Sequence, residues 1–111
     1  MAQPWFSQLH ELIQPLVEEL GADMDIECTH FFSGAAVYVN GQICMSLTPV
    51  GFALKLPDAA REMVVSEGGQ ALRYFPSGPV KKGYVLMPDT LFNSIEDRTN
   101  LMRSCVRHSA S

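Results

Sequence analysis

The most regular alternation of apolar and polar positions lies in residues 35–56, on either side of the pair Asn40-Gly41. A two-residue type I′ turn needs a positive φ at both central positions, which Asn tolerates and Gly adopts freely. The sequence therefore predicts a tight hairpin turn at this pair. Such a turn fixes three opposed pairs of residues, which are Val39 with Gln42, Tyr38 with Ile43, and Ala36 with Met45.

This register predicts one strongly apolar face and one mixed face for the hairpin. The apolar face consists of Ala36, Tyr38, Ile43, Met45 and Leu47. The mixed face consists of Val37, Val39, Gln42, Cys44 and Ser46. A second turn at 48–51 leads to a third alternating strand at 51–56, so we predict a three-stranded meander whose apolar face is covered by helices.

Apolar residues at helical spacing predict helices near 4–20, 58–67 and 93–108. In the first helix, Pro15 removes a backbone hydrogen bond and crowds the preceding turn, so we expect a kink or a break there. The second helix is predicted to begin with Asp58 as its N-cap.

The third helix is predicted to begin with a capping box, because Glu96 follows Asn93 by three residues. The residues from His108 onward are expected to fray. The side chains expected to point inward from the second and third helices are Ala60, Met63, Val64, Ile95, Leu101, Met102, Cys105 and Val106.

Further strands are predicted at 23–32, 71–75 and 84–87. The first of these has an apolar side and an acidic side, and the acidic side carries Asp23, Asp25 and Glu27. The order is a helix, several antiparallel strands, a helix, two strands and a helix, without a βαβ repeat. We therefore predict a single α+β domain over residues 1–111, with an antiparallel sheet.

Composition narrows the classes of function. Hydrophobic residues make up 47% of the chain, which excludes a disordered protein, and the formal net charge is −4. Lys81-Lys82 is the only adjacent basic pair, so unaided binding to nucleic acid is disfavoured. Neither a long apolar run nor a signal-peptide pattern occurs, and the odd number of cysteines fits a reducing compartment, so we expect a cytoplasmic protein.

Cys28 and His30 place two possible metal ligands on one side of a predicted strand. Zinc sites need three or four ligands, and the other candidates, Cys44, Cys105, His10 and His108, form no second pair at ligand spacing. A Cys–His nucleophile pair would also need an acid and an oxyanion hole, which the sequence does not indicate. We therefore expect no enzyme activity, no metal and no cofactor.

A basic segment and a set of aromatic residues could each form a binding site, but we favour a structural role for both. Lys81-Lys82-Gly83 could contact phosphate, but no strand–glycine loop–helix motif surrounds it, so it is interpreted as an exposed hairpin loop. An aromatic platform for bases would also need flanking basic residues, so core packing is favoured for its candidates, which are Tyr38, Phe52, Tyr74 and Tyr84.

Three segments resemble motifs of the TfoX/Sxy N-terminal domain, which reads Met-Phe-Gly-Gly, then Tyr-Gly-Ile-Tyr-Leu-Asp-Gly, then Leu-Tyr-Leu-Lys. The matching segments here are Phe31-Phe32-Ser33-Gly34, Val37-Tyr38-Val39-Asn40-Gly41 and Phe52-Ala53-Leu54-Lys55. Later segments, Arg73-Tyr74-Phe75 and Tyr84-Val85-Leu86-Met87-Pro88, resemble the family's Phe-x-Tyr and Tyr-x-x-Pro strands. The chain departs from the family where Ser33 and Ala36 replace glycines, and where Cys28-Thr29-His30 replaces a frequent basic pair.

The resemblance implies a stand-alone domain of α-β(3)-α-β(2)-α order, a fold shared with type III secretion chaperones. It also implies a link to the regulation of competence genes, in which family members act with the cyclic-AMP receptor protein, and it implies no catalytic residues. We therefore expect a regulatory or adaptor domain that acts through a protein partner such as a transcription factor.

The candidate partner surface is the acidic set Asp23, Asp25 and Glu27. The alternative is a dimeric chaperone for a secreted protein. In that case Trp5, Phe6 and Leu9 would lie at a dimer or client surface.

Overall fold

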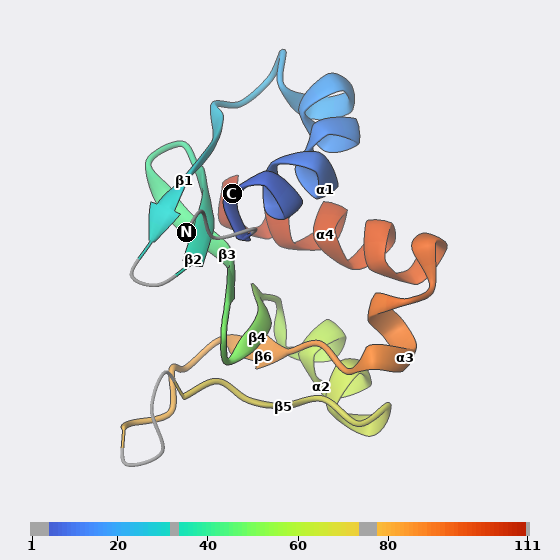
Figure 1. Cartoon of the computed structure of the whole chain (residues 1–111). Helices are drawn as coiled ribbons and strands as arrows, with labels where there is room; N and C mark the ends of the chain where they lie inside the picture. The colour runs from blue at the N-terminus through green and yellow to red at the C-terminus, as the bar shows by residue number, and fades with distance from the viewer. Residues whose placement is uncertain (1–4, 32–33, 74–77, 111) are drawn as a thin grey trace.

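A computed structural model describes residues 5–31, 34–73 and 78–110. Its centre is a six-stranded antiparallel sheet with the order β1-β2-β3-β4-β6-β5 (Figure 1). In chain order the elements are α1 (Trp5–Leu20), β1 (Ile26–Phe31), β2 (Gly34–Val39), β3 (Gln42–Thr48), β4 (Gly51–Lys55), α2 (Asp58–Ser66), β5 (Gln70–Ala71), β6 (Tyr84–Leu86), α3 (Asp89–Phe92) and α4 (Ile95–Ala110).

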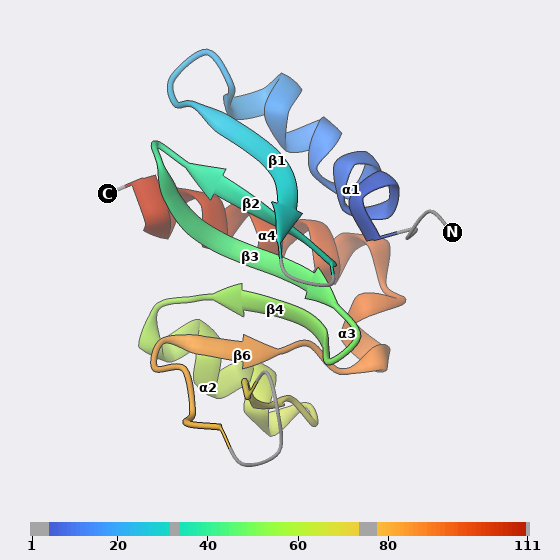
Figure 2. The ribbon, with the colours of Figure 1, turned by 60° about the vertical axis from the view of Figure 1, so that its left-hand side comes forward.

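The helices lie on one face of the sheet, and the other face carries none of them (Figure 2). This arrangement confirms the predicted α+β class with an antiparallel sheet. The family resemblance implied three strands before the second helix, and β1 adds a fourth. The β6 strand inserts between β4 and β5, so the last part of the sheet depends on pairing between segments distant in sequence.

The predicted hairpin turn is confirmed. Asn40 has φ 51° and Gly41 has φ 83°, as a type I′ turn requires. Val39 pairs with Gln42 and Tyr38 pairs with Ile43 across the turn. The two residues nearest the turn therefore have the register that the sequence predicted.

A β-bulge changes the register beyond Tyr38. Val37 lies opposite Met45, and Ala36 lies opposite Ser46, so Cys44 is an extra residue in β3. The predicted pairing of Ala36 with Met45 is therefore wrong. Because side chains alternate along a strand, one inserted residue exchanges the two faces of everything that follows it.

The inserted residue turns Met45 and Leu47 of β3 to the same face as Val37 and Val39 of β2, and this face packs under the helices. Val37 and Val39, which were assigned to the mixed face, are buried under the helices. Their neighbours in that buried face include Ala35, Met45, Leu47, Phe52, Leu54 and Val85. Tyr38 and Ile43, which were assigned to the apolar face, are half-buried on the helix-free face instead.

Helix α1 covers β1, β2 and β3 with a stripe of fully or nearly buried side chains, which are Leu9, Ile13, Leu16 and Leu20. The helix runs through Pro15 without a break, so the expected break does not occur. Pro15 lies on the exposed side, where water can reach the carbonyl that loses its backbone partner.

The helix starts differ from the predicted caps. Pro57 occupies the N-cap position of α2, and Asp58 instead forms an ion pair with Arg61 at 2.5 Å. The predicted capping box at the last helix is displaced by one residue, because the Ser94 Oγ accepts a hydrogen bond from the Asp97 N–H. Asn93 instead ends the short helix α3 with helical backbone angles, whereas an N-cap residue needs extended ones.

The predicted inward faces of the last two long helices are correct in most positions. Val64, Leu101, Met102, Cys105 and Val106 are buried. Met63 and Ile95 are exposed by 42% and 71%, so these two assignments are wrong. Fraying from His108 is also wrong, because α4 continues to Ala110 and buries Ser109.

The strand predicted at 71–75 is shorter than expected. Strand β5 covers only Gln70–Ala71, and residues 74 and 75 lie outside the described part of the chain.

A charged contact joins the first and last long helices. Arg103 of α4 donates from Nε to one carboxylate oxygen of Glu19 at 2.8 Å, and from Nη2 to the other at 2.9 Å. This two-pronged geometry is the strong form of an arginine–carboxylate pair. The hydrogen bond from Arg103 holds the pKa of Glu19 below its ordinary value of 4.5.

Replacing Gly41 with Val should destabilise the fold by about 1 kcal/mol or more, because a β-branched residue resists positive φ. An added Cβ at this position would meet no atom within 4 Å, so the whole cost is backbone strain. Urea denaturation of the two proteins measures the difference. An unchanged midpoint would contradict the assigned turn.

Replacing Gly34 with Ala should cost more, about 2 kcal/mol or more, because the clash is with rigid backbone. The new Cβ would lie closest to the Leu47 carbonyl oxygen and the Thr48 Cα, across the β2–β3 ladder. Gly41→Ala is the matched control, since it adds the same methyl group in open space. Equal denaturation midpoints for the two variants would contradict this steric explanation.

The Glu19–Arg103 pair should make stability depend on pH. Because the folded-state pKa of Glu19 is lowered, its stabilising effect is present above about pH 4.5 and is lost as the pH falls through the lowered value. Glu19→Gln should therefore reduce the unfolding midpoint at neutral pH and match the parent protein in strong acid. Glu18→Gln, an exposed neighbour, is the control and should show no such dependence; a pH-independent effect of Glu19→Gln would contradict the assignment.

Candidate functional site

Three exposed carboxylates lie where α1 leads into β1, and we call them the acidic corner. They are Asp23, Asp25 and Glu27. The sequence placed all three on one strand face, but only Glu27 lies within β1. Asp23 belongs to the turn after α1, and Asp25 directly precedes the strand.

The acidic corner is fastened to the hairpin turn by two hydrogen bonds. The Asp25 N–H donates to the side-chain Oδ1 of Asn40 at 2.9 Å. The Asn40 N–H donates to the Asp25 carbonyl oxygen at 2.8 Å. Asn40 therefore both forms the turn and holds the corner, and this fixes the backbone of Asp25 while leaving its carboxylate exposed.

The acidic corner presents its negative charges on the surface. None of its carboxylates forms an ion pair with another described residue, whereas the nearby Glu19 is occupied by Arg103. A fixed cluster of exposed, unpaired negative charge can attract a basic surface.

The Cys28 and His30 pair lies on the helix side of β1, as the alternation predicted. Burial raises the pKa of the Cys28 thiol, which disfavours the thiolate needed for attack or for metal binding. The His30 ring stacks on Phe6 of α1, with ring centroids 4.6 Å apart. Within residues 5–31, 34–73 and 78–110, no group of three or more His, Cys, Asp or Glu could hold a metal ion.

The other two cysteines join the bulge to the last helix. The Cys105 thiol of α4 donates a hydrogen bond to the carbonyl oxygen of Cys44 at 2.9 Å. Both residues are fully buried, and the pKa of Cys44 is raised by its contact with Cys105 and by burial. All three cysteines are free thiols.

The four candidate aromatic residues do not share one surface. Phe52 is buried in the core and meets Phe92 edge-on, with ring centroids 5.6 Å apart. Tyr38 and Tyr84 lie on the helix-free face, where the Tyr84 hydroxyl donates to the Ile43 carbonyl oxygen at 3.5 Å. Tyr74 lies outside the described residues.

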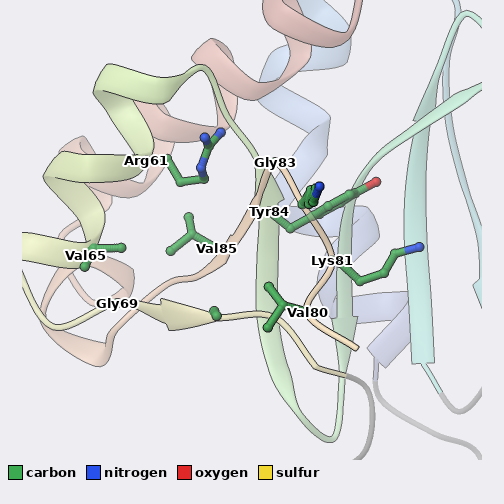
Figure 3. Close-up of a pocket in the computed structure, with 10 residues that line it drawn as sticks. Arg61, Val65, Gly69, Val80, Lys81, Gly83, Tyr84 and Val85 are labelled. Carbon is green, nitrogen blue, oxygen red and sulfur yellow. The ribbon is translucent and has the colours of Figure 1, made fainter. Parts of the chain in front are cut away.

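A pocket of about 520 Å³ opens between α2 and β6, and we call it the α2–β6 pocket (Figure 3). Its lining combines apolar and basic side chains with two glycines. The lining residues are Arg61, Val65, Gly69, Ala71, Val80, Lys81, Lys82, Gly83, Tyr84 and Val85. A second hollow of about 570 Å³ adjoins it and shares Arg61, Lys82 and Gly83.

The sequence analysis identified only part of this pocket as a possible binding site. Lys81, Lys82 and Gly83 were recognised as a possible phosphate contact, while Arg61 and Val65 of α2 were not. The local sequence around Arg61 and Val65 does not indicate that they line this pocket. Helix α2 and the loop before β6 are distant in sequence, and they are brought together where β6 pairs with β4.

Residues 5–31, 34–73 and 78–110 include no helix long and apolar enough to cross a membrane.

Comparison with curated proteins and with solved structures gave no match. The family model of the TfoX N-terminal domain matches residues 18–109, which is nearly the whole chain. The match runs from the last turn of α1 to the last turn of α4, and it includes the hairpin turn, the acidic corner and the α2–β6 pocket. The chain therefore belongs to the TfoX N-terminal domain family.

Proposed function

We propose that this protein is a regulatory or adaptor domain that acts by binding a protein partner through its acidic corner. Membership of the TfoX N-terminal domain family supports a regulatory, competence-related role at the level of the family. The observation that carries the proposal is the set of three exposed carboxylates without ion-pair partners among the described residues, fixed next to the hairpin turn.

The partner that suits this surface is a protein with a basic face, such as a transcription factor. Complementary charge speeds the encounter and selects among partners, and a rigid corner loses little conformational freedom on binding. The net charge of −4 disfavours direct contact with DNA, so regulation would pass through the partner.

The chaperone alternative depended on an apolar surface at the start of α1. Leu9 is fully buried, and Trp5 and Phe6 are half-buried against the same core. These three side chains therefore stabilise the domain itself, and the acidic corner is the better candidate for a contact surface.

Reversing two charges of the acidic corner should abolish partner binding. In Asp25→Lys/Glu27→Lys, the hydrogen bonds to Asn40 remain possible because they use only the backbone of Asp25. Affinity purification from the native cell, with quantitative mass spectrometry, should show a loss of the partner of about tenfold or more, which corresponds to about 1.4 kcal/mol.

The matched control is Glu62→Lys/Glu67→Lys, which makes the same change in net charge at exposed positions in and after α2. It should retain the partner, and circular dichroism should show both variants folded. Equal recovery from the two variants would remove the acidic corner from the proposal. Tight, salt-sensitive binding of the isolated protein to DNA would overturn the proposal as a whole.

A further inference from the structure

The α2–β6 pocket has an apolar side that the fold leaves unfilled. Val65 and Val80 are 53% and 42% exposed, although both line the pocket, and Val85 lies between them in the lining (Figure 3). A ligand that covered these side chains would remove apolar area from water, which is favourable in proportion to the area covered. The volume of about 520 Å³ lies within the range of small-molecule sites.

The charge of the pocket is opposite to that of the chain. Arg61 and Lys82 line both the pocket and the adjoining hollow. Among the described residues no carboxylate lines the pocket itself, although Asp and Glu outnumber Lys and Arg by 12 to 8 in the sequence. An anion entering here would therefore meet a local field that the protein as a whole does not offer.

Arg61 is held in place before any ligand binds. Its Nη1 donates to the Leu56 carbonyl oxygen at 2.7 Å, and its Nη2 contacts the Asp58 carboxylate at 2.5 Å. A guanidinium has more N–H donors than these two contacts use, so Arg61 can also donate to an anion. The Asp58 carboxylate lines only the adjoining hollow, where it partly offsets the charge of Arg61.

Lys82 is a second cation that can contact an anion in the pocket. It forms no ion pair with any residue in the described ranges. Lys81 also lines the pocket, but its side chain extends away from α2 (Figure 3). Arg107, an exposed residue of α4 that lines neither the pocket nor the adjoining hollow, provides a control that changes the net charge equally.

We propose that the α2–β6 pocket binds a small organic anion, a carboxylate or a phosphate ester with an apolar body. The anionic group lies between Arg61 and Lys82, and the apolar body covers Val65 and Val80. This site is separate from the acidic corner, so its existence does not depend on the proposed partner.

The test is a ¹H–¹⁵N NMR titration of the whole chain with four probes. Phenyl phosphate and phenylacetate combine an anion with an apolar ring, inorganic phosphate lacks the ring, and benzyl alcohol lacks the charge. The two aromatic anions should shift the amide signals of Val65, Gly69 and Val80 to Val85, and whichever binds more tightly identifies the anionic group. Inorganic phosphate and benzyl alcohol should each bind at least about fivefold more weakly, because each lacks one of the two contacts.

Lys82→Gln should weaken binding of the preferred aromatic anion by about fivefold, as expected for a partly exposed charge contact, while Arg107→Gln should change it by less than about twofold. Val65→Glu, at an exposed position, should abolish binding by repulsion even if Lys82 contributes little. The proposal would be overturned if the Lys82 and Arg107 variants had equal effects and binding survived Val65→Glu. It would also be overturned by shifts scattered over the helix-free face, or by an equal response to benzyl alcohol.

Discussion

The turn at Asn40-Gly41 is the constraint on which the rest of the domain depends. Its positive φ values set the pairing of Val39 with Gln42 and of Tyr38 with Ile43, where β2 and β3 begin to pair, and those strands carry the core on one face. The Asn40 side chain also binds the backbone of Asp25, so one residue orders the hairpin and the entry into β1. The shape of the acidic corner is therefore a consequence of the turn.

A second local feature, the bulge at Cys44, determines how the sheet meets the last helix. The extra residue turns Met45 and Leu47 to the helix side, where Val37 and Val39 lie, and the Cys44 carbonyl oxygen accepts a hydrogen bond from the Cys105 thiol. A buried carbonyl without a partner would be costly, and this hydrogen bond removes the cost. The two-pronged contact of Arg103 with Glu19 then fixes α4 against α1 on the same side of the sheet.

The acidic corner and the basic side chains of the α2–β6 pocket lie at opposite edges of the sheet. The acidic corner adjoins β1 at one edge of the sheet, and the α2–β6 pocket adjoins β6 and β5 at the opposite edge. Figure 2 shows β1 and β6 on opposite sides of the sheet. A partner at the acidic corner and an anion at the pocket would therefore not compete for the same surface. The net charge of −4 does not show this separation, because it adds the acidic and basic residues of the whole chain together.

The sequence by itself determined the α+β class, the hairpin turn and the exposure of the acidic corner, because each follows from local backbone preference or from periodicity. It did not determine the register beyond Tyr38. Cys44 and Met45 are both apolar, so the pattern fits a strand with or without a bulge, and only packing against α4 and α1 distinguishes the two. The tertiary structure also decided the α2–β6 pocket, because Arg61 and Lys82 line one pocket only when β6 pairs with β4 across a long sequence separation.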